Sequence, residues 1–493
     1  MKRCFFVVWC LAVLFFFIGN VSALEPAQIT QLAAKVHMDY RNLTNVKRLP
    51  LLDAVRTQRE FLVKQPGVKE VRQLRGANLF VRFQDGNELI MLLGEMRLGS
   101  ETTATQAAKS PSTATQLKPA VQAVSPAIQP GLLYLAPCAP SSNKALIFDC
   151  LEDDYNVVSP KPWQQVKTRL EILGYQVTVQ LNNSASLANA ALFDDGEYGV
   201  IFMRGHGGDL GGDFGFLVRP WYSSYPPANS GYTGTQRASA FNHATNSTQF
   251  GYIITGQFSS TYWANKTFPN TIFFLESCHG ADSGALPGMP TWTTNHGAAV
   301  WLGWNESVSF NCGDNGTALF FQKMAIGNTI GQGVSTVYAT GCRPPELVAF
   351  PTGKDSCKPG VWRSDVNEAA VPDARDFKLL KMVSDSGKLH ATITFYATPS
   401  FDEFFFYASS APTGGANVLI RCHMTNFEVY KQTSPGLYNN KVYTGGTIKS
   451  GNNYTIVIPW DVAFGAANPL YVWLYDMTGK DSLPDTGRVV IYK

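Results

Sequence analysis

One histidine and one cysteine in this sequence have neighbours typical of acyl-transfer chemistry. His206 lies between glycines in the stretch RGHGGD (204–209), and Cys278 ends the apolar run TIFFLESC (271–278). A thiolate assisted by an imidazole is a nucleophile that attacks a carbonyl carbon and forms a thioester. Glycines beside the histidine allow a substrate close to the backbone, so the N–H groups of Gly207 and Cys278 are candidates to stabilise the oxyanion.

Each residue also has an ordinary structural interpretation. A cysteine that ends a strand is often a core or disulfide residue, and a histidine between glycines is often part of a turn. The joint placement of His206 and Cys278 at the ends of two successive apolar runs favours catalysis. His279 follows the cysteine directly, and we expect a turn or pocket residue there because adjacent side chains point apart.

The other histidines show no spacing typical of metal ligands. The sequence therefore predicts no zinc or other metal, and no cofactor. These histidines are His37, His243, His296, His390 and His423.

The elements that must position the two residues are the strands and helices of a predicted α/β domain at 132–375. Short apolar runs alternate there with amphipathic segments, which indicates a parallel sheet covered by helices on both faces. The predicted strands are KALIFDC, YQVTVQL, YGVIFMR, TIFFLESC and GAAVWLGWN. Functional groups in such sheets gather at the carboxyl ends of the strands. If the strands before His206 and Cys278 are neighbours, roughly 5 Å apart, imidazole and thiol lie close together.

The rest of the chain divides by composition. Residues 1–23 have the basic start, apolar core and small cleavage residues of a secretory signal peptide. Residues 24–100 read as a small α+β domain with a hairpin at Asp85-Gly86, and 101–131 as a cleavable Ser/Thr/Pro/Ala-rich linker. From 376 to 493 the hydrophobic period is two, which predicts an immunoglobulin-like β-sandwich.

Composition bounds the function further. The chain of 493 residues is 45% hydrophobic, with a net charge of +3 and no long charge runs, so we expect folded domains and no nucleic-acid partner. After the signal peptide no apolar stretch is long enough to span a membrane. We therefore expect a soluble protein that is secreted or periplasmic.

Cysteine usage fits an oxidising compartment but leaves one thiol over. The chain has 9 cysteines, and Cys4 and Cys10 leave with the signal peptide, so the mature chain keeps an odd number. Cys138–Cys150 and Cys342–Cys357 are close enough in sequence to close small loops, although connectivity does not follow from spacing. The odd thiol is compatible with a reactive Cys278.

The two motifs in this order resemble the caspase–haemoglobinase fold of cysteine peptidases. This group includes caspases, legumain, gingipains, clostripain and the catalytic subunit of GPI transamidase. RGHGGD is similar to the transamidase motif, LESCHG is similar to legumain's acidic–Ala–Cys stretch, and GAAVWLGWNESVS fits the strand after the nucleophile. The resemblance covers about 132–340, and a β-sandwich after the catalytic domain is similar to the gingipain layout.

The resemblance implies roles for three residues. His206 would be the general acid/base, Cys278 the nucleophile and Gly207 an oxyanion amide, in a dyad without an obligatory third member. The separation of His206 and Cys278 is longer than usual for the family, so the insertion at 209–268 is expected to form a lid, a substrate wall or an adhesive loop.

Candidate specificity residues also follow from the resemblance. In legumain-like enzymes the acidic residue two before the nucleophile lines the pocket, which points to Glu276. In gingipain- and clostripain-like enzymes an acidic residue after the first strand does so, which points to Glu152, Asp153 or Asp154. A buried carboxylate favours a cationic side chain, so we expect a basic residue before the scissile bond. The alternatives are a solvated acidic loop and a Glu276 that pairs internally. Trp304 is either an apolar pocket wall or a core residue.

The sequence therefore predicts a secreted cysteine endopeptidase that acts on protein or peptide substrates through a thioester. The second hypothesis is a transpeptidase or transamidase, which passes the same acyl group to an amine. The third is a non-catalytic adhesin or binding protein. The domain at 24–100 is either a propeptide removed at the linker or a plain binding module.

Overall fold

The computed structural model of the chain forms two compact units, which are described separately. The described residues of the first unit fall within 24–94, 140–322 and 330–355, and those of the second fall within 138–139, 323–329 and 356–493. The predicted signal peptide and linker lie outside the described residues. The described residues are 24–75, 77–94, 138–154, 156, 158–193, 197–264, 267–281, 288–340, 342, 345–351, 353–364, 376–385, 387–401, 403–413, 415–476, 482–483 and 488–493.

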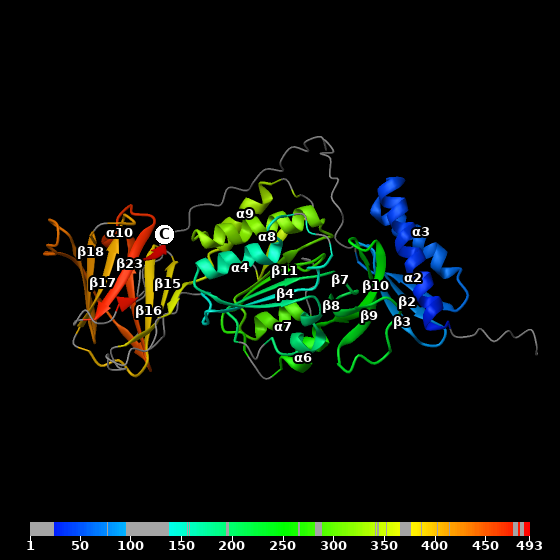
Figure 1. Cartoon of the computed structure of the whole chain (residues 1–493), viewed down its shortest axis with the longest axis horizontal. Coiled ribbons are helices and arrows are strands. Elements are labelled where there is room, and N and C mark those ends of the chain that lie inside the picture. The colour runs from blue at the N-terminus through cyan, green and yellow to red at the C-terminus, as the bar shows by residue number, and fades with distance from the viewer. Residues whose placement is uncertain are drawn as a thin grey trace, which may run out of the picture. The chain divides into compact units, whose positions relative to one another are not determined.

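The first unit is built around a six-stranded sheet with the order β13-β12-β11-β6-β4-β5 (Figure 1). All neighbours pair in parallel except β13, which is antiparallel to β12. The five strands predicted to be parallel are therefore confirmed, and β6 and β11, which precede His206 and Cys278, are neighbours. The strands are β4 (Lys144–Asp149), β5 (Gln176–Leu181), β6 (Val200–Arg204), β11 (Ile272–Glu276), β12 (Val300–Trp304) and β13 (Leu347–Phe350).

Helices cover both faces of this sheet, as the apolar runs predicted. In Figure 1, α4, α8 and α9 lie along one face, and α6 and α7 lie along the other. The helical segments are α4 (Pro162–Ile172), the 3₁₀ turn η2 (Asn182–Ser184), α5 (Leu187–Ala190), α6 (Gly256–Tyr262), α7 (Met289–Asn295), α8 (Phe310–Ala325) and α9 (Ile330–Tyr338).

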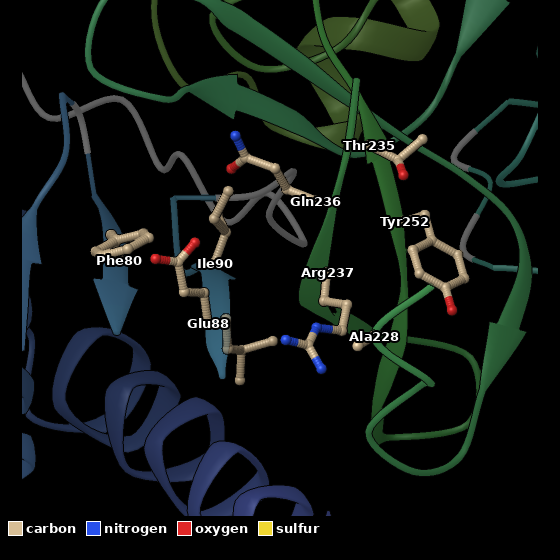
Figure 2. A pocket seen from close by; sticks show the side chains of 9 residues that line it. Phe80, Glu88, Ile90, Ala228, Thr235, Gln236, Arg237 and Tyr252 are labelled. Carbon is tan, nitrogen blue, oxygen red and sulfur yellow. The ribbon is translucent and has the colours of Figure 1, made fainter. Parts of the chain in front are cut away.

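A second sheet in the same unit joins the N-terminal segment to the insertion. Its order is β1-β2-β3-β9-β10-β8-β7, and β3 pairs with β9 in parallel through Ile90–Ala238 and Met91–Ser239 (Figure 2). The predicted hairpin at Asp85-Gly86 joins β2 and β3. The strands are β1 (Val68–Gln73), β2 (Asn78–Phe83), β3 (Glu88–Leu92), β7 (Gly207–Asp209), β8 (Phe214–Tyr222), β9 (Thr235–Asn242) and β10 (Ser247–Ile254).

The N-terminal helices pack on this second sheet. Helix α2 (Pro26–Arg41) continues into the π-helical turn η1 (Asn42–Val46), and α3 (Leu51–Val63) follows. Their buried apolar side chains share a core with Phe250 of β10, so the segment that the composition set apart at 24–100 buries part of its apolar surface against the insertion.

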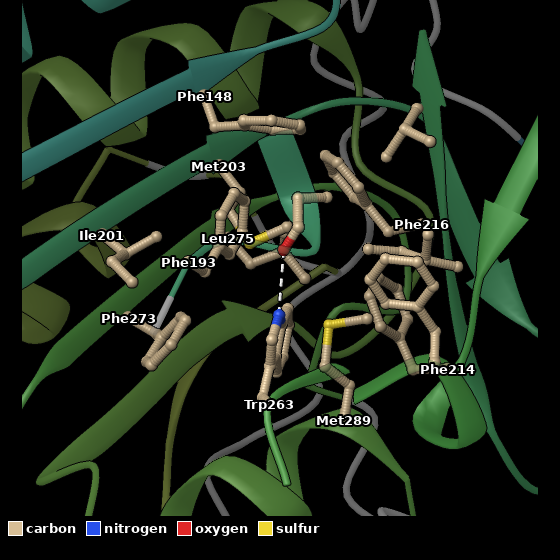
Figure 3. Packing of buried hydrophobic residues seen from close by; sticks show 14 of the residues in the cluster. Phe148, Phe193, Ile201, Met203, Phe214, Phe216, Trp263, Phe273, Leu275 and Met289 are labelled. Carbon is tan, nitrogen blue, oxygen red and sulfur yellow. Dashed lines mark hydrogen bonds between the residues drawn. The ribbon is translucent and has the colours of Figure 1, made fainter. Parts of the chain in front are cut away.

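Aromatic packing on both faces of the parallel sheet holds β11 within it. Phe274 of β11 packs on Phe320 and Phe321 of α8, while its neighbour Phe273 stacks on Trp301 of β12. Alternate residues of the strand are thus buried on opposite faces. On the α6 and α7 side, Trp263 donates a hydrogen bond to the carbonyl oxygen of Ala190 at 2.9 Å (Figure 3).

The second unit consists of two antiparallel sheets with the orders β14-β15-β16-β22-β21 and β20-β19-β18-β17-β23-β24, where β25 also pairs with β23. Phe404 of β17 contacts Phe377, Phe395 and Tyr454 of the other sheet, so the two sheets form a sandwich. The immunoglobulin-like assignment stays a prediction.

The sandwich contains one short helix, α10 (Trp460–Ala463). The strands of the second unit are β14 (Val361–Ser364), β15 (Phe377–Asp385), β16 (Lys388–Phe395), β17 (Glu403–Ser409), β18 (Val418–His423), β19 (Asn426–Lys431), β20 (Asn440–Gly446), β21 (Ile448–Ser450), β22 (Asn453–Pro459), β23 (Leu470–Asp476), β24 (Ser482–Leu483) and β25 (Val489–Ile491).

Two disulfides form, Cys138–Cys357 and Cys312–Cys342. Neither of the two short-loop pairings that the spacing allowed is present, because Cys138 pairs with Cys357, Cys342 pairs with Cys312, and Cys150 is a free thiol. Cys278 is a thiol and not half of a cystine. In the part of the chain that the structure describes, no helix has the length and hydrophobicity needed to cross a membrane.

Candidate active site

The candidate catalytic residues follow the carboxyl ends of β6 and β11 at the same level of the sheet. Arg204, the last residue of β6, is paired with Glu276, the last residue of β11. The pairing continues beyond the strands, since the N–H group of Gly205 donates to the carbonyl oxygen of Glu276 at 3.2 Å. His206 and Cys278 each come two residues after the aligned pair, on strands spaced roughly 5 Å apart.

The loops that carry these two residues touch each other. A Cβ atom on Gly207 would collide with the hydroxyl oxygen of Ser277 and would lie 2.8 Å from the carbonyl oxygen of Gly215. The residue after the histidine and the residue before the cysteine are therefore in contact. Only glycine fits at position 207 without moving one of the two loops.

The chain turns sharply after Cys278, and a left-handed residue makes the turn. His279 has φ 57°, and its N–H group donates to the carbonyl oxygen of Glu306 at 3.0 Å. Its Nε2 atom lies 3.2 Å from Oγ of Ser307. The turn packs directly on β12, where a Cβ atom on Gly303 would lie 2.7 Å from the carbonyl carbon of Gly280. His279 thus acts as a turn residue, one of the two roles expected for it.

The Cys278 thiol is fully buried. Its Sγ atom accepts a hydrogen bond from the N–H group of Val308 at 3.3 Å and lies 3.6 Å from that residue's carbonyl oxygen. A reactive thiol must be accessible to substrate, as the sequence interpretation required. The structure does not show this accessibility, since the Cys278 side chain is 0% exposed.

His206 is also fully buried, and Asp154 approaches it. The Nε2 atom of the imidazole lies 3.5 Å from Oδ2 of Asp154, and the ring stacks on Trp221 with centroids 5.6 Å apart. The other carboxylate oxygen of Asp154 accepts N–H groups of His243 at 2.7 Å and Ala244 at 3.1 Å. The insertion thus orients Asp154 toward the histidine.

The electrostatics of Asp154 favour an ionised carboxylate. Burial by itself would raise the pKa of Asp154, but the hydrogen bond and charge of His206, the charge of His243 and the N–H group of Ala244 together lower the pKa below its ordinary value. A carboxylate beside an imidazole fixes the orientation of the ring and stabilises its protonated form. The resemblance implied a pocket role for Asp154, whereas the geometry brings it to the histidine.

The neighbouring acidic residues have cationic partners. Glu152 forms an ion pair with Lys161 and accepts a hydrogen bond from Asn182 at 2.8 Å. Asp153 forms an ion pair with Arg219, and its side chain remains 46% exposed. The three adjacent carboxylates thus differ: Glu152 and Asp153 face cations, and Asp154 faces the imidazole.

The other two candidate specificity residues lie in the core beneath the site. Glu276 is fully buried, where it accepts hydrogen bonds from Nε of Arg204 at 3.0 Å and from the hydroxyl of Thr317 at 2.6 Å. This is the internal pairing that we considered as the alternative to a pocket role. Trp304 is also fully buried, against Gly316 of α8, which matches the core interpretation.

The N-terminal segment contacts the loop after His206 and the partner of His279, and sequence reasoning did not find these contacts. A Cβ atom on Gly208 would collide with the side-chain amide of Asn78, and Arg75 lies 4.0 Å from Asp209. A Cβ atom on Gly94 would lie 2.8 Å from Oγ of Ser307, the partner of His279. These contacts place the N-terminal segment against residues that adjoin His206 and His279.

Helix α2 adds a buried histidine to this cover. The Nε2 atom of His37 lies 3.1 Å from Oγ of Ser239. The pKa of His37 is lowered to about 3, chiefly by burial and then by the positive charge of His206, with smaller contributions from Arg41 and His243, while Ser239 opposes the shift. The neutral imidazole is therefore the form that fits between α2 and the insertion.

We expect acid to weaken this cover. Because the folded pKa of His37 lies below the unfolded value of 6.5, the stability it contributes is present above pH 6.5 and is lost as the pH falls toward 3. The linkage amounts to about 2 kcal/mol between pH 7 and pH 5. Denaturant unfolding at both pH values would measure it, with His37→Gln as the comparison. An equal loss in the variant would assign the pH dependence to other groups.

A cavity of about 170 Å³ lies at the junction of β3 and β9 (Figure 2). It contains neither His206 nor Cys278. It marks the place where the N-terminal strands and the insertion are joined by little backbone pairing. Its lining residues are Phe80, Glu88, Leu89, Ile90, Ala228, Thr235, Gln236, Arg237 and Tyr252. Within the described ranges, no three His, Cys, Asp or Glu residues gather as metal ligands.

Comparisons with known proteins find only distant likenesses. No known family and no curated protein matches the sequence. The complex of the pro- and mature domains of Porphyromonas gingivalis RgpB matches with TM-score 0.30 and 10% identity, over 67% of this chain and 65% of that chain. The Arg-specific cysteine proteinase gingipain R (RgpB) matches with TM-score 0.30 and 10% identity, over 71% and 67%. This chain thus spans less than two thirds of the first of these structures. We base the proposed function on the residues of the site and not on these matches.

Proposed function

We propose that this protein is an exported cysteine endopeptidase, with Cys278 as the nucleophile and His206 as the general base. One observation carries the proposal: the two residues follow the ends of adjacent parallel strands by the same number of positions, and their loops are in contact. A structural histidine and a structural cysteine need no such common placement.

The chemistry consists of acylation and deacylation. His206 takes the proton of the Cys278 thiol, and the thiolate attacks the scissile carbonyl carbon. The N–H groups of Gly207 and Cys278 stabilise the negative oxygen that develops. The C–N bond breaks, and the amine leaves with the proton from the imidazolium. Water, deprotonated by His206, then attacks the thioester carbon, the C–S bond breaks, and the acid is released while the imidazolium returns its proton to the Cys278 thiolate.

Asp154 acts in this proposal by orienting His206. We expect Asp154→Asn to lower kcat up to about 100-fold with little change in KM, because the imidazole loses its orienting charge. Asn keeps an oxygen for the N–H groups of His243 and Ala244, so the fold should persist. An unchanged kcat in the folded variant would return Asp154 to a structural role.

The predicted preference for a basic residue rests on Asp153. Among the four acidic candidates it is the most exposed, with a side chain 46% exposed against 20% for Glu152, and it is adjacent in sequence to Asp154. A substrate cation would replace Arg219 as its partner. Asp153→Asn should therefore raise KM for peptides with arginine or lysine before the scissile bond and leave kcat unchanged. This result is the reverse of the one expected for Asp154→Asn.

The proposal also includes a latent form of the enzyme, in which the N-terminal segment blocks the active site. The segment at 24–100 acts as a propeptide that covers the loops of His206 and Cys278, and cleavage in the linker at 101–131 begins its release. The supporting contacts are those of Asn78 with Gly208 and of Gly94 with Ser307.

The experiment compares intact protein with protein cut in the linker by an added protease. Both are given a peptide library, an alkylating probe for Cys278 and a primary amine. Faster labelling and peptide hydrolysis in the cut protein would support the endopeptidase. Products that carry the added amine would identify a transpeptidase instead. Labelling without any turnover would favour the non-catalytic binding protein.

A further inference from the structure

A fully buried charge cluster lies directly beneath the candidate active site. We name it the Arg204 cluster, and it consists of Asp149 at the end of β4, Arg204 at the end of β6, Glu276 at the end of β11 and Asp314 of α8. All four side chains are 0% exposed. The three strand residues are aligned across the sheet, Asp149 with Arg204 and Arg204 with Glu276.

All three nitrogen atoms of the Arg204 guanidinium group donate hydrogen bonds. Nε lies 3.0 Å from Oε1 of Glu276, and Nη2 lies 2.9 Å from Oδ1 of Asp314. Nη1 lies 3.4 Å and 3.5 Å from the two oxygens of Asp149, and 3.1 Å from the carbonyl oxygen of Leu151. A planar group with five donors can bridge four partners in this way, whereas a lysine ammonium cannot.

Such a cluster is costly for folding alone. Buried ions lose their hydration, and well-packed apolar side chains of similar volume stabilise a core at least as well. Burial raises the pKa of Asp149 and of Glu276, and the positive charge of Arg204 opposes that rise in both. A parallel sheet of apolar strands has no need of these groups at its centre, so their position within the fold calls for another reason.

The cluster joins the three strand ends from which the proposed catalytic residues leave. Asp149 precedes the loop to Asp154, Arg204 precedes His206, and Glu276 precedes Cys278. The first loop is held twice, since the N–H group of Leu151 donates to Oδ1 of Asp149 at 2.8 Å while its carbonyl oxygen accepts from Arg204. The guanidinium group of Arg204 therefore links the starting points of the three loops that lead to Asp154, His206 and Cys278.

We propose that Arg204 is a positioning residue of the active site, which holds Asp154, His206 and Cys278 in register by linking the ends of β4, β6 and β11. It does not contact substrate. The inference rests on the proposed function for its kinetic readout, but the geometry of Cys278 relative to His206 can also be followed without turnover.

The test uses Arg204→Lys, which keeps the charge and loses the fork, and Glu276→Gln, which keeps the shape and removes one charged partner. Leu302→Ala, at a fully buried position of β12, is the control for general loss of stability. For each protein, cut in the linker, kcat, KM, the midpoint of denaturant unfolding and the pH dependence of Cys278 alkylation are measured. A thiol held beside an imidazole shows a lowered apparent pKa in such a profile.

We expect Arg204→Lys to lower kcat roughly 100-fold with KM within about threefold, and to move the alkylation profile to higher pH. Glu276→Gln should change both in the same direction and by less. Leu302→Ala should lower the unfolding midpoint and leave kcat and the profile unchanged. If Arg204→Lys fails to fold, the kcat and the alkylation profile of Glu276→Gln test the proposal instead.

The inference is overturned if the folded Arg204 cluster variants keep both kcat and the alkylation profile of the original protein. Loss of activity in proportion to loss of folded protein, as in the control, would also overturn it. Failure of the proposed function looks different: the original protein would then show no turnover. A shifted alkylation profile in the cluster variants would in that case still support positioning of Cys278 by Arg204.

Discussion

Replacement of Cys278 by alanine should abolish turnover and leave the fold intact. If the Cys278 sulfur is the nucleophile, the thioester with this sulfur cannot form in the variant, and we expect kcat to fall by at least about 10⁴-fold. The free energy of unfolding should fall by only about 1–2 kcal/mol, because one buried sulfur and its contacts with Val308 are lost. Steady-state kinetics on the linker-cut protein and denaturant unfolding would measure the two effects.

Cys150 supplies a matched control. It is also a fully buried thiol, it follows β4 in the same sheet, and its Sγ atom lies 3.6 Å from the carbonyl oxygen of Ala185. Burial raises the pKa of this thiol, which makes it a poor nucleophile. Cys150→Ala should keep full activity at a similar cost in stability. Turnover that survives in Cys278→Ala, or disappears equally in Cys150→Ala, would contradict the proposed nucleophile.

Substitution of Gly207 by alanine should have the second largest effect. The new methyl group would collide with the hydroxyl of Ser277 and press on the carbonyl oxygen of Gly215, so the loops of His206 and Cys278 would move apart. Displacement of reacting groups by about 1 Å can cost about 100-fold in rate. Overpacking of this kind also destabilises by about 1–3 kcal/mol. We expect a large fall in kcat with a moderate loss of stability.

A double variant separates this cause from a general disturbance. Ser277→Ala removes the hydroxyl that the new methyl group meets first, and it should restore part of the kcat lost in Gly207→Ala. Recovery should be incomplete because Gly215 remains close. Gly446→Ala, where nothing lies within 4 Å of the added atom, should change neither kcat nor the free energy of unfolding. Equal kcat in Gly207→Ala and the original protein would show that the two loops move independently.

The sequence was sufficient for the parts of the fold that local pattern determines. The apolar runs that end at Arg204 and Glu276 could only be buried strands, and a parallel sheet then brings their carboxyl ends to one edge. The same reasoning found His206 and Cys278 as a pair. In the second unit, strict alternation of apolar and polar residues sufficed for antiparallel strands, which the paired sheets confirm.

Long-range pairing left no local signal. The parallel contact of β3 with β9 joins segments far apart in the chain, so composition alone set 24–100 apart from the insertion. The disulfide Cys138–Cys357 spans 219 residues, whereas spacing favoured nearby partners. In both cases the deciding contacts depend on how complete elements pack, and no short stretch of sequence contains that information.

The acidic residues show the same limit at the scale of one site. Glu152, Asp153 and Asp154 are adjacent and chemically similar, so the sequence could not say which one faces the histidine. The choice is made by the N–H groups of His243 and Ala244, which belong to the insertion and hold one oxygen of Asp154. Arg204 was overlooked for a related reason, since its three carboxylate partners come from three distant segments.

The limited backbone pairing between β3 and β9 has a consequence for how the proposed inhibition by the N-terminal segment would end. Only two residue pairs join these strands, so the N-terminal segment is held mainly by the side chains that it packs against the insertion and by the covalent tether of the linker. A tether keeps a weakly bound partner in place because its local concentration is in the millimolar range. Once the linker is cut, binding of the N-terminal fragment depends on its concentration in solution. Dilution after export lowers that concentration and should favour dissociation of the fragment.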